Sequence, residues 1–324
     1  MTDRYARQMV LPGIGAEGQA RLGASSVLVI GAGGLGCAVL QYLAAAGVGR
    51  IVIVDHDRIE ESNLHRQPLF RMSELGQAKA TIARDSLRQL NPRIVLDALV
   101  ERLAPANAPR LTSMAELIID AADSLAATYI LSDECMRVRK PLVSASVLGF
   151  SGYVGAFCGG APSYRAVFPE MPRQAGSCSE AGVLGTAVGV MGTLQAHVAL
   201  ALLLGLQPSP LGELITVDFR ALRFGGFSFR GAPEPAGAAF GFISPEEVAK
   251  GDIVIDLRSL EEAPASPLAD ALRLQVEDIE RGKGQFPSDV RVVLCCRSGV
   301  RAWRAARALE RRGHRRLALV AFGG

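Results

Sequence analysis

A glycine-rich turn near the N-terminus has the spacing of a phosphate-binding loop. Gly31, Gly33 and Gly36 form a G-x-G-x-x-G motif that follows a β-branched stretch, residues 27–30, and precedes a helical pattern, residues 37–46. Glycines permit the tight turn and let backbone N–H groups at a helix N-terminus approach a phosphate. The sequence therefore predicts a nucleotide site. Alone, the motif fits a dinucleotide dehydrogenase as well as any other nucleotide enzyme.

Acidic, amide and cationic side chains follow the next apolar stretch. Asp55 comes about 20 residues after the last glycine, where a carboxylate can hold a ribose hydroxyl. Asp57, Asn63, Arg66 and Lys79 come soon afterwards. Two cations and an amide beside a phosphate loop suit a triphosphate, whereas hydride transfer has no need of them. The alternative is that Arg66 and Lys79 are solvated surface charges.

Two cysteines lie in contexts that favour reactivity. Cys178 is surrounded by glycine and polar residues just before a long apolar helix, which favours an exposed loop. Cys296 follows a strand pattern, residues 292–294, and Arg301 begins the next helix five positions later. Helix N–H groups and a nearby cation stabilise a thiolate or a persulfide. The alternative for each is the packing role of most free cysteines, which we expect for Cys37, Cys135 and Cys158.

The elements around these residues predict a parallel sheet. A strand, glycine turn, helix and second strand within residues 27–54 form a βαβ unit. Further strands are expected at 95–100, 117–121 and 141–146, and helices at 77–90, 125–137 and 182–204. The predicted fold class is α/β, with a Rossmann-like doubly wound sheet followed by a smaller α/β domain.

A change in composition near residue 224 predicts two domains. Residues 227–239 are rich in Gly and Pro and are interpreted as a linker between domains at 1–226 and 240–324. In the second domain, Ser244 is expected to cap a helix before a strand at 253–255. A chain of 324 residues suits two domains of unequal size.

Composition excludes several classes of protein. The chain is 49% hydrophobic and 21% charged, as in a folded protein, and its net charge of +3 indicates no nucleic-acid surface. The longest apolar stretch, residues 198–206, is shorter than a membrane span, and the N-terminus lacks the apolar core of a signal peptide. The six cysteines include no C-x-x-C pair. We expect a cytoplasmic enzyme without nucleic-acid or membrane partners.

Six motifs together resemble the ThiF/MoeB/HesA adenylyltransferases, relatives of ubiquitin-activating enzymes. The motifs are Arg4-Tyr-Ala-Arg-Gln8, Gly31-Ala-Gly-Gly-Leu-Gly36, Ser62-Asn-Leu-His-Arg-Gln67, Gly76-Gln-Ala-Lys79, Asp120-Ala-Ala-Asp123 and Cys178-Ser-Glu-Ala-Gly182. They occur in the family's order and spacing over residues 1–224. The resemblance implies an enzyme that uses ATP and Mg²⁺ to adenylate the C-terminal Gly-Gly carboxylate of a small ubiquitin-like sulfur-carrier protein (ThiS- or MoaD-like).

The resemblance also implies a role for each matching residue. Nucleotide contacts would come from Gly31, Gly33, Gly34, Gly36, Asp55, Asp57, Asn63, Arg66 and Lys79. Asp123 would carry Mg²⁺, with Arg66 and Lys79 acting on the triphosphate. Arg7 would reach into the nucleotide site of the other subunit of a homodimer. Cys178 would form a covalent acyl or persulfide link with the carrier.

The loop from Cys296 to Arg301 resembles the active-site loop of rhodanese sulfurtransferases, as do Asp256-Leu-Arg258 and Phe322-Gly-Gly324. This resemblance implies a Cys296 persulfide that turns the carrier into a thiocarboxylate, filled by a donor such as a cysteine desulfurase. Residues 264–281 lack the family's His-Ile-Pro-Gly-Ala segment, so a degenerate, inactive rhodanese domain is the alternative.

Two departures from the adenylyltransferase pattern have consequences. Ser163 and Ala166 stand where the family has a C-x-x-C pair, and no cysteine lies between Cys178 and Cys295. We therefore expect no zinc site. Ser124 replaces the Asn that usually follows the magnesium Asp. Two other functions stay open: an NAD-dependent oxidoreductase using the same glycine loop, and a non-catalytic module that docks a ubiquitin-like protein.

Overall fold

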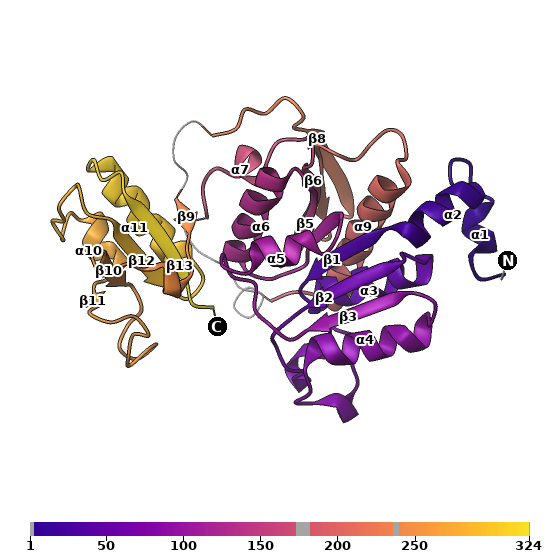
Figure 1. Ribbon diagram of the computed structural model, residues 1–324, viewed down its shortest axis with the longest axis horizontal. Helices are drawn as coiled ribbons and strands as arrows, with labels where there is room; N and C mark the ends of the chain where they lie inside the picture. The colour runs from indigo at the N-terminus through magenta and orange to yellow at the C-terminus, as the bar shows by residue number, and fades with distance from the viewer. Residues whose placement is uncertain (1–2, 173–181, 236–239, 324) are drawn as a thin grey trace.

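The computed structural model describes residues 3–172, 182–235 and 240–323, and it contains two sheets (Figure 1). The first sheet has eight strands in the order β3-β2-β1-β4-β5-β6-β7-β8, and the second has five in the order β11-β10-β12-β13-β9. The second sheet and its helices lie at one end of the molecule, and helices α1 and α2 lie at the other (Figure 1).

The elements of the first unit span most of the chain. Its strands are β1 (Ser26–Ile30), β2 (Arg50–Val54), β3 (Val95–Leu99), β4 (Leu117–Asp120), β5 (Pro141–Leu148), β6 (Ser151–Cys158), β7 (Glu213–Asp218) and β8 (Arg223–Ser228). Its α-helices are α1 (Ala6–Met9), α2 (Gly15–Ala24), α3 (Gly34–Ala46), α4 (Lys79–Leu90), α5 (Ala108–Ser113), α6 (Leu125–Val138), α7 (Tyr164–Val167) and α9 (Gly185–Leu204). Short 3₁₀ turns cover Asp3–Tyr5, Glu61–Asn63 and Met72–Glu74.

The second unit is smaller and parallel throughout. Its elements are β9 (Gly241–Phe242), a 3₁₀ turn (Pro245–Glu247), β10 (Ile253–Asp256), β11 (Leu272–Arg273), α10 (Val276–Glu280), β12 (Val292–Cys296), α11 (Val300–Arg311) and β13 (Leu317–Ala321). The prediction of a helix after Ser244 is wrong, because the Ser244–Glu247 capping box closes only a single 3₁₀ turn. The turn ends there because Val248 is extended.

The first sheet is mixed, with a larger parallel part and a smaller antiparallel part. Strands β3, β2, β1, β4 and β5 run parallel, which agrees with the βαβ pattern. Strands β6, β7 and β8 continue the sheet in antiparallel pairs, and the sequence pattern did not predict them. Glycines at 152, 155, 225 and 226 weaken the usual strand signal, and β8 is exposed along its whole length.

Helix α9 agrees with the helix expected at 182–204 and contains most of the apolar stretch 198–206. With 20 residues and a mean hydropathy of 1.8, it is long and apolar enough to cross a membrane by length and composition. However, more than half of it is buried, and it packs against α3 and β5. Gly192 allows close contact with α3, since a Cβ there would lie 2.6 Å from the Leu35 carbonyl oxygen. In this fold α9 is a core helix.

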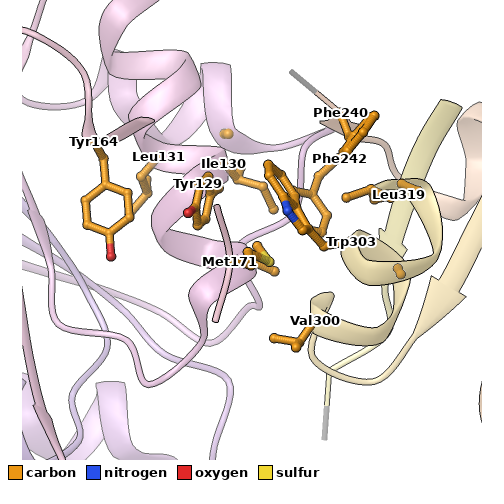
Figure 2. Packing of buried hydrophobic residues seen from close by; sticks show 14 of the residues in the cluster. Tyr129, Ile130, Leu131, Tyr164, Met171, Phe240, Phe242, Val300, Trp303 and Leu319 are labelled. Carbon is orange, nitrogen blue, oxygen red and sulfur yellow. The ribbon is translucent and has the colours of Figure 1, made fainter. Parts of the chain in front are cut away.

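The two units share a hydrophobic core. Figure 2 shows Trp303, Phe240 and Phe242 of the second unit facing Tyr129 and Met171 of the first. The Tyr129 and Trp303 ring centroids are 5.4 Å apart. The Trp303 indole N–H also donates to the Glu170 carboxylate at 3.1 Å. This contact fixes the position of α11, and therefore of the loop before it, against α6.

Candidate functional site

The glycine loop has the geometry that its spacing predicts. β1 ends at Ile30 and α3 begins at Gly34. Gly31 has a φ of +100°, and a Cβ on it would lie 2.6 Å from the Ala121 carbonyl oxygen. A Cβ on Gly36 would lie 2.0 Å from the Gly31 carbonyl oxygen. Only glycine fits these positions, and the turn presents the first N–H groups of α3, which have no intrahelical partners.

Asp55, directly after β2, holds this loop in place. Its two carboxylate oxygens accept N–H groups from Ala32 and Asp57, each at 2.7 Å. The side chain is buried, and burial raises the pKa of Asp55 above its ordinary value. Each oxygen keeps a lone pair that could accept a ribose hydroxyl. The geometry is therefore compatible with the ribose contact, which stays a prediction.

Asp57 and Lys79 form an ion pair beside the loop. The Lys79 Nζ lies 2.9 Å from Asp57 Oδ2, with the lysine buried and the carboxylate half exposed. Burial opposes ionisation of Asp57, but the hydrogen bond and charge of Lys79 hold its pKa below the ordinary value. The Lys79 N–H also donates to the Asp57 carbonyl at 2.9 Å, at the start of α4. Lys79 is therefore a fixed cation rather than a solvated one.

Asn63 and Arg66 lie on the segment that follows Asp57. Asn63 is buried, and the partly exposed Arg66 donates from its guanidinium to the Ser62 carbonyl oxygen at 3.1 Å. Gln67 ends the same sequence motif, and the motif alone predicts no contact for it. Its Oε1 is buried without a hydrogen-bond partner, and its Nε2 lies 3.7 Å from where a Gly33 Cβ would be. An unsatisfied acceptor beside the loop fits a donor from a bound nucleotide or water.

Asp120 and Asp123, at the end of β4, have different environments. The Asp120 Oδ2 accepts the hydroxyls of Thr128 and Ser144 at 2.7 and 2.8 Å, and complete burial raises its pKa to about 6. Asp120 is thus a structural group. Asp123 is exposed just before α6, where its carboxylate can meet a ligand.

The described residues contain one further group that could hold a cation. Ligand atoms of Asp55, His56 and Asp57 lie within 4.8 Å of one another. Oxygen ligands of this kind suit Mg²⁺. However, the Asp55 oxygens are already engaged with backbone N–H groups. The exposed Asp123 is therefore the freer carboxylate, and its magnesium role remains a prediction.

The structure does not bring Arg7 to the nucleotide loop of its own chain. Arg7 lies on α1, where the neighbouring Gln8 donates to the Ala46 carbonyl oxygen at 2.9 Å. Ala46 ends α3, whereas the glycine loop begins it, and a helix of 13 residues is about 20 Å long. Arg7 therefore lies a helix length away from the loop. The other predicted carrier-site residue, Cys178, lies outside the described residues.

The second unit holds its predicted thiol in a cradle of backbone N–H groups. The Cys296 Sγ accepts the N–H of Gly299 at 3.1 Å and that of Ala302 at 3.4 Å. The thiol is completely buried, and burial raises its pKa, although these N–H groups and Arg301 oppose the shift. The Arg301 side chain is itself held by an ion pair. Its guanidinium pairs with Glu262, at 2.5 and 2.7 Å, and that partner was not predicted.

The other cysteines of the first unit are packing residues, as expected. Cys37, Cys135 and Cys158 are all completely buried. Burial raises the pKa of the Cys37 and Cys158 thiols to about 12, and it raises that of Cys135 as well. Burial in the core of the first unit therefore keeps these three thiols protonated and out of reach of reagents in the folded chain.

Hydrogen bonds occupy the position of the missing C-x-x-C pair. The N–H and hydroxyl of Ser163 donate to the two carboxylate oxygens of Glu234, at 2.7 and 2.6 Å. Arg165, on the same short helix α7, forms an ion pair with Asp133. The Glu234 contacts tie the segment after β8 to α7, and the Arg165–Asp133 pair ties α7 to α6.

We expect the protein, purified without added metal, to contain well below one zinc ion per chain, because Ser163 and Ala166 offer no thiolates. Elemental analysis of the purified protein measures this directly. The matched control is a double variant, Ser163→Cys with Ala166→Cys, which should still bind no stoichiometric zinc since it supplies only one pair. Stoichiometric zinc in the native chain would reveal a site outside these positions.

A groove runs along the antiparallel part of the first sheet. Its volume is about 650 Å³, and its lining includes Ser146, Leu148, Tyr153, Asp218, Arg223 and Phe224. Ser144, which bonds Asp120, precedes Ser146 by two residues and so lies on the same face of β5. The groove therefore begins next to the sheet edge that carries Asp120, which pairs with Ser144. Sequence reasoning missed it, since it depends on the unpredicted strands β6–β8.

Comparisons with known proteins agree with this geometry. The ThiF family model matches residues 5–235. "Adenylyltransferase and sulfurtransferase MOCS3" of Sus scrofa is 45% identical over 218 residues, covering 66% of this chain and 48% of the relative. "Sulfur carrier protein adenylyltransferase" of Thermus thermophilus is 42% identical over 239 residues, covering 71% and 88%. The chain spans about half the length of its MOCS3 relatives.

Solved structures share the fold. A crystal structure of E. coli MccB superposes with a TM-score of 0.63 at 20% identity, covering 73% of this chain and 71% of MccB. A crystal structure of PaaA gives 0.60 at 21% identity, covering 70% and 73%. The expected Rossmann-like α/β fold is thereby confirmed. Since the family model matches most of the chain and the Thermus protein is aligned over nearly its whole length, this chain belongs to the ThiF family.

Proposed function

We propose that the chain uses ATP to adenylate the C-terminal Gly-Gly carboxylate of a small ubiquitin-like sulfur carrier, and then delivers sulfur to it. The observation that carries this proposal is the buried Lys79, held by Asp57 beside the open N-terminus of α3. A fixed cation at a phosphate loop serves phosphate chemistry and has no purpose in hydride transfer. The names of the Thermus and MOCS3 relatives point to the same activity.

In the adenylation step, the carrier's carboxylate attacks the α-phosphorus of ATP and pyrophosphate leaves. No general base is needed because the nucleophile is already ionised. Lys79 and Arg66 oppose the charge that builds between the α- and β-phosphates. Asp123 would hold Mg²⁺, which brings the two anions together. MccB, which shares the fold, has been solved with ATP.

We assign the groove beside Asp120 to the carrier's tail. An extended Gly-Gly segment is narrow enough to lie along β5, and it would lead its carboxylate toward Asp123. Exposed aromatic side chains near the groove, Phe150, Phe224 and Phe227, would cover the carrier's apolar surface. The Arg7 placement supports a homodimer in which each subunit supplies this arginine to the other.

In the sulfur step, the second unit, near 240–324, acts as a rhodanese-like domain. The first domain extends past the expected limit at 226, because β8 continues to Ser228 and Phe229 packs on Phe157, so the connection between the domains is shorter than 227–239. A donor such as a cysteine desulfurase loads a persulfide on Cys296. Its terminal sulfur attacks the carrier's acyl carbon, the bond from that carbon to the phosphate oxygen breaks, and AMP leaves with the electron pair. The Cys178 thiolate then attacks the Cys296 sulfur and releases the thiocarboxylate. An external dithiol reduces the resulting disulfide.

Pyrophosphate exchange tests the proposal. We expect the full chain with Mg²⁺ to exchange labelled pyrophosphate into ATP only when a ubiquitin-like protein ending in Gly-Gly is present. A carrier lacking its last two glycines is the matched control. Carrier binding without exchange would identify a docking module, and reduction of NAD in the protein's presence would identify an oxidoreductase. Either result would replace the present assignment.

A further inference from the structure

The thiol loop of the second unit touches the nucleotide edge of the first. A Cβ on Gly299, in the Cys296 loop, would lie 3.4 Å from the Ala126 Cβ. Ala126 is in the first turn of α6, three residues after Asp123. Val300 and Ala126 also belong to one buried apolar cluster. The loop therefore packs beside the carboxylate assigned to Mg²⁺.

A series of polar contacts through Arg102 also joins the Cys296 loop to the nucleotide site. The Phe322 N–H donates to the Cys296 carbonyl oxygen at 3.0 Å, and Arg102 Nη1 donates to the Phe322 carbonyl oxygen at 3.1 Å. The Arg102 Nη2 lies 2.6 Å from His56 Nε2, and His56 lies 3.2 Å from Asp57. One guanidinium thus contacts Phe322, which bonds the backbone of Cys296, and His56, which lies beside the Asp57 carboxylate that fixes Lys79.

We propose that sulfur passes within a single chain, from Cys296 to an acyl adenylate on the neighbouring nucleotide site, and that Arg102 is the positioning residue that keeps the two sites together. The inference rests on the proposed function. Beyond that function, it states that the Cys296 thiol serves the nucleotide site of its own chain. It also gives a role to Arg102, which lies outside the adenylyltransferase motifs.

The burial of Cys296 sets a condition on this relay. Its sulfur lies beneath Gly299 and Ala302 and is completely buried, so the loop has to part from α6 before a donor or an acyl group reaches it. Loosening the Arg102 contacts should make that opening more frequent. The rate at which Cys296 reacts with a small alkylating reagent measures the opening.

The first experiment alkylates the full chain with iodoacetamide and follows each cysteine by peptide mass spectrometry. Arg102→Ala should raise the Cys296 rate about tenfold, the effect of losing one hydrogen bond to a charged group. The Cys296 rate in Arg102→Lys should lie between those of Arg102→Ala and the native chain, since an ammonium keeps the charge but lacks the planar fork that reaches Phe322 and His56 from separate nitrogens. Arg110→Ala, which removes a nearby arginine paired with Glu101, should change it less than about twofold. Equal Cys296 alkylation rates in Arg102→Ala and the native chain would refute the positioning role of Arg102.

Cys37, buried in the core of the first unit, is the internal control. Its alkylation requires unfolding of the first unit, so an unchanged Cys37 rate shows that the variant is folded. If Cys37 and Cys296 accelerate together in Arg102→Ala, the residue acts on overall stability, and its positioning role is excluded.

The second experiment asks which chain's thiol is used. Cys296→Ser and Lys79→Ala chains are co-expressed with different tags, and mixed dimers are isolated and assayed for thiocarboxylate on a Gly-Gly carrier. Relay within a chain predicts no recovery, because the intact nucleotide site and the intact thiol lie on different chains. Recovery to about half the native rate per dimer would show transfer between chains and overturn the proposal. Absence of pyrophosphate exchange in the native chain would instead refute the proposed function.

Discussion

Chains carrying Arg7→Ala and chains carrying Lys79→Ala are each expected to lose about a thousandfold of carrier-dependent pyrophosphate exchange. Co-expressed, they should regain about a quarter of the native activity, because half of the dimers are mixed and each mixed dimer has one intact site of two. The physical reason is the length of α3. Lys79 serves the site of its own chain, whereas Arg7 lies near the opposite end of that helix.

The matched control for this experiment is Arg4→Ala, which removes an exposed arginine from the same N-terminal arm. It should leave exchange within about twofold of the native value. Size-exclusion chromatography with two affinity tags establishes that mixed dimers form. If mixed dimers form and stay inactive, Arg7 does not act across the subunit interface, and the proposed sharing of sites is wrong.

Asp123→Ala is expected to lower carrier-dependent pyrophosphate exchange about a hundredfold or more, because removing a carboxylate from Mg²⁺ leaves the phosphate charges uncompensated. The residue is exposed, so its replacement should leave the thermal midpoint of unfolding nearly unchanged. The exchange rate is measured over a Mg²⁺ titration.

Asp85→Ala provides the control for Asp123, since Asp85 is a half-exposed carboxylate on α4 that pairs with Arg84. Its exchange rate should match that of the native chain at every Mg²⁺ concentration. Native exchange by a folded Asp123→Ala protein would move the metal assignment to another carboxylate, and Asp57 would then be the first to test.

The parts of the fold that the sequence predicted are those fixed by local backbone constraints. Gly31 needs a positive φ and Gly36 allows no Cβ, so a phosphate loop is recognisable from spacing alone. The strands β1, β2 and β4 are buried on both faces and appear as short apolar runs. Local sequence therefore determines the parallel part of the first sheet.

The parts that were missed depend on partners far apart in the chain. Glu262 holds Arg301 from 39 positions away, and Glu234 bonds Ser163 from 71 positions away. Neither carboxylate stands in a motif, since only the folded chain brings the two members of each pair together. The strands β6 and β8 were missed for a related reason: both contain glycines and are stabilised by their neighbours in the sheet rather than by their own propensity.

The burial of Trp303 at the contact between the two units makes the chain optically informative without a label. It is the only tryptophan in the sequence, and its ring lies near Tyr129 while its N–H bonds Glu170. Intrinsic fluorescence therefore reports on one place, the boundary between the nucleotide unit and the thiol unit. Separation of the two would expose the indole to water and shift its emission to longer wavelength, so stopped-flow mixing can time that motion against each chemical step.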